Sequence, residues 1–328
     1  MKKFVKNIIL FAILPLFVVV AFDIYLRTNN SLYTEKYDGL LQQKELVEVL
    51  ILGNSHATYA VDPTQFSDHY AYNLANVSQR IYFDKRLTQK ALQEGLPNLN
   101  YVLISVDYHS LASSSQGIRN VWSYYANGIK YKEQNYLKET ISPLIWGYTP
   151  KVAISLLKKD VVRSIRYGKE VVSFDVEHGV NIHDPLTKGY MGLEGQDEVR
   201  FTEAEYKSRA AIFLEKDDNK ERAEIIADLS EFIEYLIDRD IQPILFSTPT
   251  FHEYNNYLNQ DQVNRNISDI NKLTDFYELS YWRFNEDERF LKDDFYNQDH
   301  LNKKGAEKFS KILNEKLNNY SVNNPPKP

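Results

Sequence analysis

The stretch VLILGNSHATYAV, residues 49–61, is the most informative part of the chain. Four consecutive apolar residues run directly into Gly53, Asn54, Ser55 and His56. A short segment that is apolar on both faces is typical of a buried strand in a parallel sheet. In α/β proteins, a glycine and a small hydroxyl residue after such a strand present either a nucleophile or a cradle for phosphate. The stretch therefore predicts a parallel sheet with a candidate site at the end of one strand.

Further along the chain, strand-like and helix-like segments alternate. Four short, β-branched segments are predicted strands and a fifth is weaker: Val47–Leu52, Ala71–Ala75, Tyr101–Val106, Gln242–Ser247 and the region near Phe276–Phe284. Helical periodicity lies between and after them, at Phe83–Glu94, at Arg222–Ile237 and after Asn302. This alternation predicts an α/β domain, from about residue 47 to residue 320, whose parallel sheet is covered by helices on both sides.

Residues 108–218 interrupt this alternation. They contain scattered aromatic residues and no clean strand, so we expect a mainly helical insertion. Because the insertion follows the third strand, it emerges where ligands bind in open α/β sheets. It either forms part of a substrate cleft or packs on the flank of the sheet. At the other end of the chain, residues 321–328 (SVNNPPKP) are predicted to be a disordered tail.

Composition excludes several classes of function. The chain has 328 residues, of which 43% are apolar, so it is long enough to bury a substantial core. Its net charge is −6 with acidic and basic residues mixed throughout, which argues against nucleic acid as a partner. The absence of cysteine excludes disulfides, thiolate zinc sites and a cysteine nucleophile.

The N-terminus has the pattern of a membrane anchor. Three lysines among the first six residues precede an apolar run from Ile8 to Phe22. If the flanking charges extend to the interfaces, Val5–Leu26 is long enough to span a bilayer, with the N-terminus cytoplasmic and the rest of the chain periplasmic or extracellular. Residues 27–46 would be a juxtamembrane linker with a short helix. A signal peptide cleaved after Ala21 and a buried core helix are the alternatives.

The sequence also indicates which kind of site Ser55 belongs to, a phosphate cradle or a nucleophile. A phosphate cradle would need further glycines in register or a Gly-Lys-Ser/Thr motif, and neither is present. A serine nucleophile needs a base from elsewhere in the chain. The stretch DDFYNQDHLNKKGAEKF, residues 293–309, supplies His300 just before the last predicted helix, with acidic residues close by. A loop leaving that edge of the sheet can bring the imidazole over the end of the first strand.

Together, GNSH at 53–56 and DHLN with GA at 299–306 resemble the SGNH (GDSL-like) hydrolases. The resemblance covers roughly residues 47–107 and 220–318. It implies a flavodoxin-like three-layer α/β/α fold. The anchor pattern makes the chain similar to bacterial membrane-tethered members that handle O-acylation of cell-surface polysaccharides.

Carried over residue by residue, the resemblance implies that Ser55 attacks an ester carbonyl and forms an acyl-enzyme. His300 would take the serine proton and later protonate the leaving alcohol. A carboxylate would orient the imidazole and stabilise its charged form. Asn297 stands where the family places this acid, three residues before the histidine. We therefore expect Asp299 to take the role, with Asp294 or Asn297 as alternative orienting residues.

The resemblance also implies an oxyanion hole. The family's glycine in the second block is replaced here by Ala75, whose backbone N–H would still serve. The third block, Gly-x-Asn-Asp, is missing. Asn73 and Asn76 are the side chains that would substitute for its donor. One missing donor costs about 2.7 to 4 kcal/mol of transition-state stabilisation.

Other polar residues admit two interpretations. His56 either stabilises the turn by a hydrogen bond or takes part in catalysis, and Asp107 and His109 either face the cleft or cap a loop. The histidines and aspartate of EHGVNIHDP, residues 177–185, have a spacing compatible with a metal, although glycine and proline favour an ordinary polar loop. We predict no cofactor and no metal.

The leading hypothesis is a membrane-anchored, extracytoplasmic serine acyl esterase or O-acyltransferase that acts on a cell-envelope carbohydrate ester. Its expected partners are an acylated carbohydrate or envelope polymer, the lipid bilayer through residues 5–26, and a membrane-bound acyl-donor protein. Two alternatives remain. One is a catalytically silent module of the same fold that binds polymer or organises an envelope assembly complex, and the other is a secreted esterase released by cleavage at Ala21.

Overall fold

The computed structural model describes residues 2–28, 32–112, 124, 128–129, 186–215 and 218–323. The chain divides into two compact units, one made of Met1–Glu35 and Gly117–Pro185 and the other of Lys36–Gln116 and Leu186–Pro328. The first unit contains helix α1 (Lys2–Thr28) and the start of α2 (Leu32–Gln42). The second unit contains the sheet and every candidate site residue.

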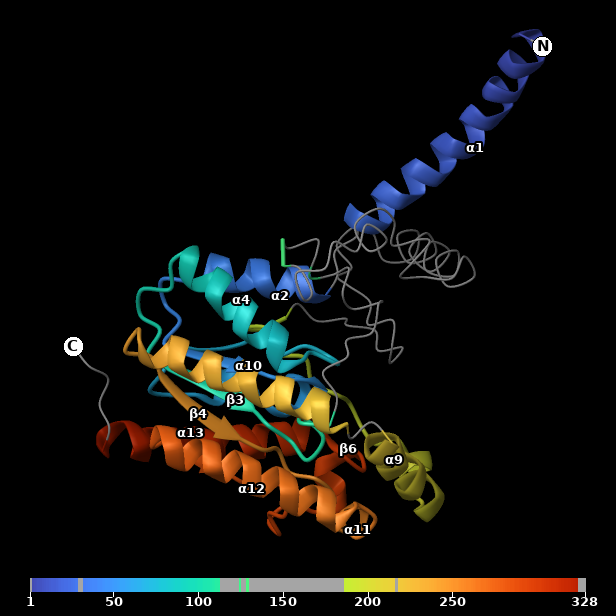
Figure 1. Ribbon diagram of the computed structural model, residues 1–328. Helices are drawn as coiled ribbons and strands as arrows, with labels where there is room; N and C mark the ends of the chain where they lie inside the picture. The colour runs from blue at the N-terminus through green and yellow to red at the C-terminus, as the bar shows by residue number, and fades with distance from the viewer. Residues whose placement is uncertain are drawn as a thin grey trace. The chain divides into compact units, whose positions relative to one another are not determined.

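The sheet of the second unit has five parallel strands in the order β2-β1-β3-β4-β5 (Figure 1). Their bounds are β1 Val49–Leu52, β2 Ala71–Asn73, β3 Tyr101–Ser105, β4 Gln242–Phe246 and β5 Tyr281–Trp282. The four strong strand predictions and the weaker fifth each contain one of these strands. The order is that of flavodoxin-like doubly wound sheets, in which ligands bind beyond the carboxyl ends of the strands. The predicted α/β class with a parallel sheet is therefore confirmed.

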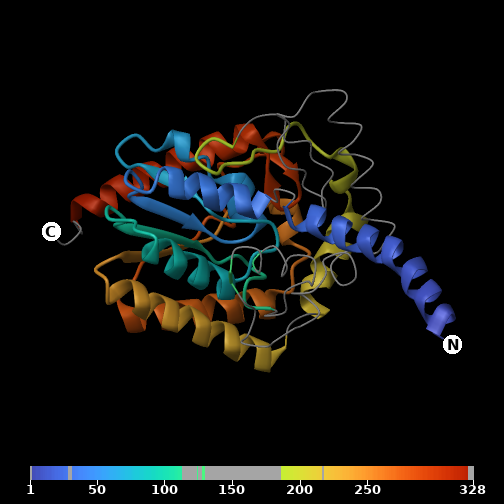
Figure 2. The same ribbon diagram turned by 90° about the horizontal axis from the view of Figure 1, so that it is seen from above.

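Helices cover both faces of this sheet (Figure 2). On one side α10 (Asn219–Ile237) packs against α4 (Ile81–Gln93). A hydrogen bond connects α10 to α12 (Gln260–Tyr277), because Arg222 Nε donates to Asp269 Oδ2 at 2.9 Å. On the other side α13 (Lys303–Asn323) packs against α3 (Ser55–Ala60). The apolar stripe predicted for α10 is buried: Ile225, Leu229, Phe232, Ile233 and Leu236.

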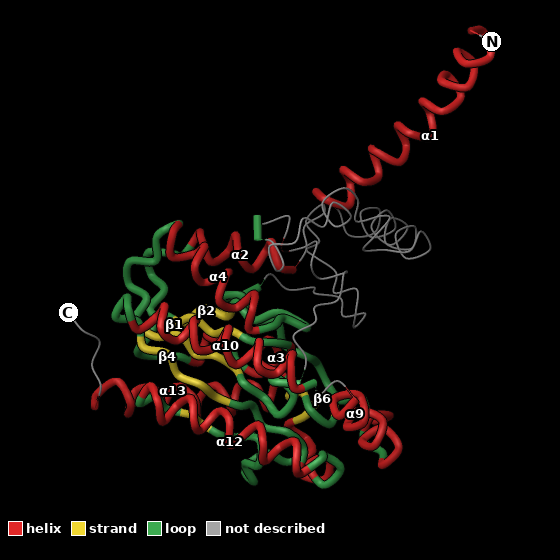
Figure 3. The backbone as a smooth tube through the Cα atoms, viewed as in Figure 1, coloured by secondary structure: helices red, strands yellow, loops and turns green. Residues whose placement is uncertain are grey.

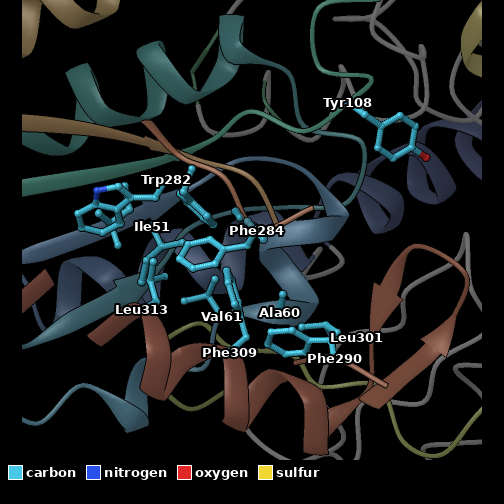
Figure 4. Close-up of a cluster of buried hydrophobic side chains, with 14 of the residues drawn as sticks. Ile51, Ala60, Val61, Tyr108, Trp282, Phe284, Phe290, Leu301, Phe309 and Leu313 are labelled. Carbon is cyan, nitrogen blue, oxygen red and sulfur yellow. The ribbon is translucent and has the colours of Figure 1, made fainter. Parts of the chain in front are cut away.

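A large apolar cluster fills the space between the sheet and α13. Figure 4 shows Ile51 of β1, Val61 after α3, Phe284 after β5, and Phe309 and Leu313 of α13 gathered there. Phe309 and Leu313 lie one helical turn apart, so both point to the same side of the helix. This packing holds the first strand and the last helix together, which brings the two sequence motifs to one side of the molecule.

The remaining elements lie in the connections and are short apart from α9, which is shown with β6 and α3 at one end of the sheet in Figure 3. They are η1 Pro63–Gln65, η2 Glu198–Arg200, α9 Glu203–Glu215, α11 His252–Asn255, η3 Lys292–Asp294, and the antiparallel pair β6 Phe295–Asn297 and β7 His300–Leu301. The pair β6–β7 turns the chain back just before α13, and His300 lies on it.

The structure bears on two expectations about the ends of the chain. Helix α13 continues to Asn323, three residues into the predicted disordered tail, and Leu317 on it is fully buried. Helix α1 includes the apolar run predicted as an anchor. Nevertheless, no helix in the described part of the chain is both long enough and apolar enough to count as a bilayer-spanning segment, so that expectation is not supported.

Most of the predicted insertion, residues 113–185, lies outside the described residues apart from 124, 128 and 129. Its last part, near residues 203–215, is helical as expected, because α9 occupies it. The metal-like spacing within residues 177–185 also lies outside the described residues. Helix α12 is an element that the strand and helix pattern did not predict, although it buries Val263, Ile270 and Leu273.

Candidate active site

Ser55 lies in a tight turn that only glycine can start. Gly53 has a φ of +133°, and a Cβ added to it would lie 2.6 Å from Ser105 Cβ. Its N–H donates to Asp84 Oδ1 at 3.1 Å, which ties the turn to α4. Asn54 then caps α3, because its side chain accepts from His56 N–H at 2.9 Å. Ser55 is the first residue of that helix and is partly exposed, so the turn presents its hydroxyl to solvent.

His300 faces this hydroxyl from the other motif. The distance from His300 Nε2 to Ser55 Oγ is 2.8 Å, although 245 positions separate the two residues in the sequence. His300 is buried in β7, which packs against α3. The structure therefore brings together the two residues that the sequence singled out as nucleophile and base, in hydrogen-bonding geometry.

The other imidazole nitrogen of His300 has two acceptors. Asn297 Oδ1 lies 3.0 Å from Nδ1 in hydrogen-bonding geometry, and Asp299 Oδ1 lies 3.2 Å from it as an ion-pair partner. Neither oxygen carries a proton, so Nδ1 is protonated and Nε2 directs its lone pair at Ser55. Asn297 is itself fixed, because its Oδ1 also accepts the backbone N–H of Asp299 at 3.1 Å and that of His300 at 2.9 Å.

The orienting role is thus divided between two of the three predicted residues. Asn297 sets the tautomer, and Asp299 supplies the negative charge that an imidazolium needs. Asp294, the third candidate, is directed elsewhere, since its carboxylate accepts from Leu291 N–H and binds Lys308 Nζ at 2.9 Å. It stabilises the start of α13 and does not orient His300.

Electrostatics keep His300 neutral at physiological pH. Burial lowers its pKa to about 4, with the positive charges of His56 and Arg209 acting in the same direction and Asp299 opposing them. A neutral imidazole is the form that can accept the serine proton. The base is therefore ready above about pH 4 and becomes protonated below it.

Asp299 is the centre of a buried charged network that the sequence did not reveal. Arg209 of α9 donates from Nε to Asp299 Oδ2 at 2.8 Å, and the Tyr108 hydroxyl donates to the same oxygen at 3.1 Å. The Tyr254 hydroxyl in turn lies 2.9 Å from that of Tyr108. Burial opposes ionisation of Asp299, but Arg209 and His300 hold its pKa well below the usual range. The carboxylate stays ionised.

The residues predicted for the oxyanion hole do not offer free donors. The N–H of Ala75 donates to Asn73 Oδ1 at 3.0 Å. The amide of Asn73 donates to Ala57 O and Val61 O, and that of Asn76 donates to Leu74 O and Gln79 Oε1. The reason is local: the loop after β2 is buried, so its donors pair with nearby oxygens of the same loop and of the segment 57–61. These three assignments are corrected.

One donor of the expected oxyanion hole does remain. The backbone N–H of Ser55 has no hydrogen-bond partner among the described residues, as is usual for a residue in the first turn of a helix. It lies on the nucleophile itself, next to the place where a tetrahedral oxyanion would form.

His56 neither stabilises the turn with its side chain nor faces Ser55. Its ring is buried, with Nδ1 3.3 Å from Thr248 Oγ1 and 3.7 Å from Asp107 Oδ1, and Nε2 3.6 Å from Asp299 Oδ2. Burial acts against its charge, but the two aspartates raise the pKa of His56 to about 9.

Asp107 and His109 belong to the same buried region. Asp107 Oδ1 accepts from Thr248 N–H at 2.9 Å, and its Oδ2 accepts from the Ser105 hydroxyl at 2.7 Å. His109 Nε2 lies 3.4 Å from Asn54 Nδ2, and burial and His56 lower its pKa well below the usual range. Asp107 thus joins the ends of β3 and β4, as a loop-capping residue would.

His56, Asp299 and His300 offer three ligand atoms within 4.8 Å of one another, which is a spacing that can hold a metal ion. However, several of these atoms already have partners within the protein. His300 is engaged by Ser55 and Asn297, and Arg209 already neutralises Asp299. We interpret the group as a buried network of ion pairs and hydrogen bonds.

Comparison with models of known protein families and with the sequences of curated proteins produced no match for this chain.

Proposed function

We propose that the second unit is a serine acyl esterase or O-acyltransferase of the SGNH type. The observation that carries this proposal is the 2.8 Å contact between His300 Nε2 and Ser55 Oγ, with acceptors for His300 Nδ1 behind it. His300 takes the proton of Ser55 as the hydroxyl oxygen attacks an ester carbonyl. The same nitrogen then returns the proton to the departing alcohol and leaves an acyl-Ser55 intermediate.

Deacylation follows the same path in reverse. A water molecule or a sugar hydroxyl gives its proton to His300 Nε2 and attacks the acyl carbonyl. His300 Nε2 then returns that proton to Ser55 Oγ as the bond between the acyl group and Ser55 breaks. Asp299 stabilises the imidazolium in both halves, while Asn297 keeps Nδ1 protonated throughout. The Ser55 N–H contributes one donor to each tetrahedral intermediate. A carbohydrate ester as the substrate rests on the sequence resemblance.

A second candidate function is favoured by one specific observation. The donors predicted for the oxyanion hole at Ala75, Asn73 and Asn76 are all used in hydrogen bonds to nearby oxygens, those of Asn73 to Ala57 O and Val61 O. Because each missing donor costs about 10²- to 10³-fold in turnover, a module of the same fold that binds polymer without catalysis is the alternative.

The location at a membrane is likewise a proposal. The described residues of α1 expose eight large apolar side chains: Phe4, Phe11, Ile13, Leu14, Leu16, Phe17, Val18 and Val20. An apolar helix preceded by lysines suits an anchor whose domain lies outside the cytoplasm. If so, deletion of residues 1–28 moves the protein from the membrane fraction to the soluble one. Equal distribution of the two forms contradicts the proposal.

Labelling with a fluorophosphonate tests the enzymatic function. The full chain is expected to gain one adduct on Ser55, and the Ser55→Ala variant none. Ser67→Ala is the matched control, because Ser67 is an exposed serine that bonds Asp68 and has no imidazole partner among the residues that the structure describes. A folded protein that reacts no better than Ser55→Ala supports the silent module.

A further inference from the structure

Asp299 also contacts a second imidazole, that of His56, which in turn contacts a second carboxylate, that of Asp107. His56 follows Ser55 in α3, Asp107 follows β3, and Thr248 follows β4. All three side chains are buried, with exposures of 1%, 2% and 1%, respectively. The proposed ester chemistry uses none of them, and three separate strand ends contribute to the group.

Hydrogen bonds fix the proton on one nitrogen of His56. The Thr248 hydroxyl donates to Asp107 Oδ1 at 2.9 Å, so its proton is committed. His56 Nδ1 lies 3.3 Å from that hydroxyl oxygen, which leaves the oxygen as acceptor and Nδ1 as donor. Asp107 is thus connected to His56 both directly, at 3.7 Å, and through Thr248.

The other nitrogen faces a carboxylate. His56 Nε2 lies 3.6 Å from Asp299 Oδ2, and no hydrogen-bond partner satisfies it. Opposite an ionised oxygen in a buried site, a protonated nitrogen is favourable and a lone pair is repelled. Both nitrogens of His56 therefore carry protons.

The charges next to His56 favour its protonated form. Asp107 and Asp299 contribute two buried negative charges, and Arg209 contributes one positive charge. A neutral His56 would leave one buried carboxylate without compensation, which proteins avoid. Burial lowers the pKa of His109 and His300 and raises that of Tyr108, so these three groups are neutral at pH 7, while the positive charge of Arg80 acts on His109.

We propose that His56 is a positioning residue, charged at neutral pH, that bridges Asp107 and Asp299 and holds the Asp299 carboxylate at His300. The contact chain runs from Ser55 through His300 and Asp299 to His56, Thr248 and Asp107. The inference rests on the proposed function for its catalytic meaning, but the charge of His56 is a property of the folded chain alone.

His56 also adjusts the strength of the base. Its positive charge lowers the pKa of His300, in opposition to Asp299. Replacing His56 by a neutral residue removes that repulsion, so the pKa of His300 rises. A residue that only fills space would not change this pKa.

The test is a pH titration of the histidine side chains by nitrogen NMR, carried out on the full chain with Ser55→Ala. The same titration is repeated in this background with His56→Gln, with Asp107→Asn and with both substitutions together. Because this background cannot be acylated, failure of the proposed function leaves the result intact. We expect the His56 ring to keep both protons at pH 7. We also expect His56→Gln to raise the pKa of His300, and Asp107→Asn to raise it in the same direction because His56 loses its partner.

The double variant is expected to shift the pKa of His300 no further than His56→Gln does, because Asp107 acts through His56. A His56 ring that carries one proton at pH 7 in the Ser55→Ala chain overturns the proposal, and this measurement needs no variant at His56 or Asp107. An unchanged pKa of His300 in folded His56→Gln overturns it as well.

Discussion

The loops after β1 and β2 leave neighbouring strands at the same edge of the sheet, yet they use their polar groups differently. In the loop after β1, Ser55 keeps its hydroxyl directed at His300 and its N–H without a partner among the described residues. At the end of β2 and in the loop after it, the N–H groups are already hydrogen-bonded to one another's side chains and to nearby carbonyls; these are the donors of Asn73, Ala75 and Asn76. A polar residue at the carboxyl end of a strand is therefore available for chemistry only if the loop leaves it unsatisfied.

Substitution of Ser55 is the strongest way to test the first loop. We expect Ser55→Ala to lower ester turnover by about 10⁴-fold or more, because the covalent route is lost. Steady-state hydrolysis of an activated acetyl ester measures it, with Ser67→Ala as the control that should keep the parental rate. Comparable loss in both variants would show that neither serine is the nucleophile.

A carboxylate at position 297 tests whether Asn297 and Asp299 have separate roles at His300. Asn297→Asp keeps the acceptor for Nδ1 and adds a negative charge close to the imidazole, so the pKa of His300 should rise by about 1 to 3 units. The acid limb of kcat/KM would then move upward from about pH 4 in the parent protein. Asn297→Ala, which removes the acceptor without adding charge, is the comparison. If the limb stays in place in Asn297→Asp, His300 is not the group that titrates.

The loop after β2 should respond in stability rather than in rate. Asn76→Ala removes a buried amide that bonds Leu74 O and Gln79 Oε1, so we expect about 1 to 3 kcal/mol of stability to be lost in urea unfolding. Turnover of the folded variant should change by no more than a few fold. A loss of about 10²-fold in kcat with unchanged stability would instead place an oxyanion donor in this loop.

A further expected effect is the pH dependence of stability that comes from His56. Its pKa is about 9 in the folded chain and about 6.5 when unfolded. A raised pKa means that the folded state holds the proton more tightly, so this stabilisation is complete below about pH 6.5 and is lost as pH rises through 9. The urea midpoint of the parent should fall more between pH 6 and pH 10 than that of His56→Gln. Parallel curves would contradict it.

The sequence allowed the sheet to be predicted because its strands are short, apolar runs, and the helix stripe of α10 was equally readable. It also led to Ser55, which follows a glycine turn at the end of the first predicted strand, and to His300, which stands just before the last predicted helix. Arg209 could not be found in this way. It lies on α9 within a segment without clear strand or helix alternation, and only the folding of the chain brings it to Asp299.

The errors have a common physical origin. Hydrogen bonding within a buried loop cannot be read from the residue types that it contains, so the donors near Ala75 seemed available. In the same way, the two interpretations of His56 rest on its position next to Ser55 in the sequence. Its side-chain contacts come instead from the ends of β3 and β4 and from Asp299. The positions of Asp107 and Thr248 in the sequence do indicate that they belong near the site, because each follows a buried parallel strand at the edge where ligands bind.

The central claim is that His300 activates Ser55, and the rate of fluorophosphonate modification as a function of pH tests it most directly. The account predicts that Ser55 alone is modified, that the rate falls as pH decreases toward about 4, and that His300→Gln slows it by about 10²- to 10⁴-fold. Peptide mapping identifies the modified residue. Modification of another serine, or an equal rate in folded His300→Gln, would contradict the account.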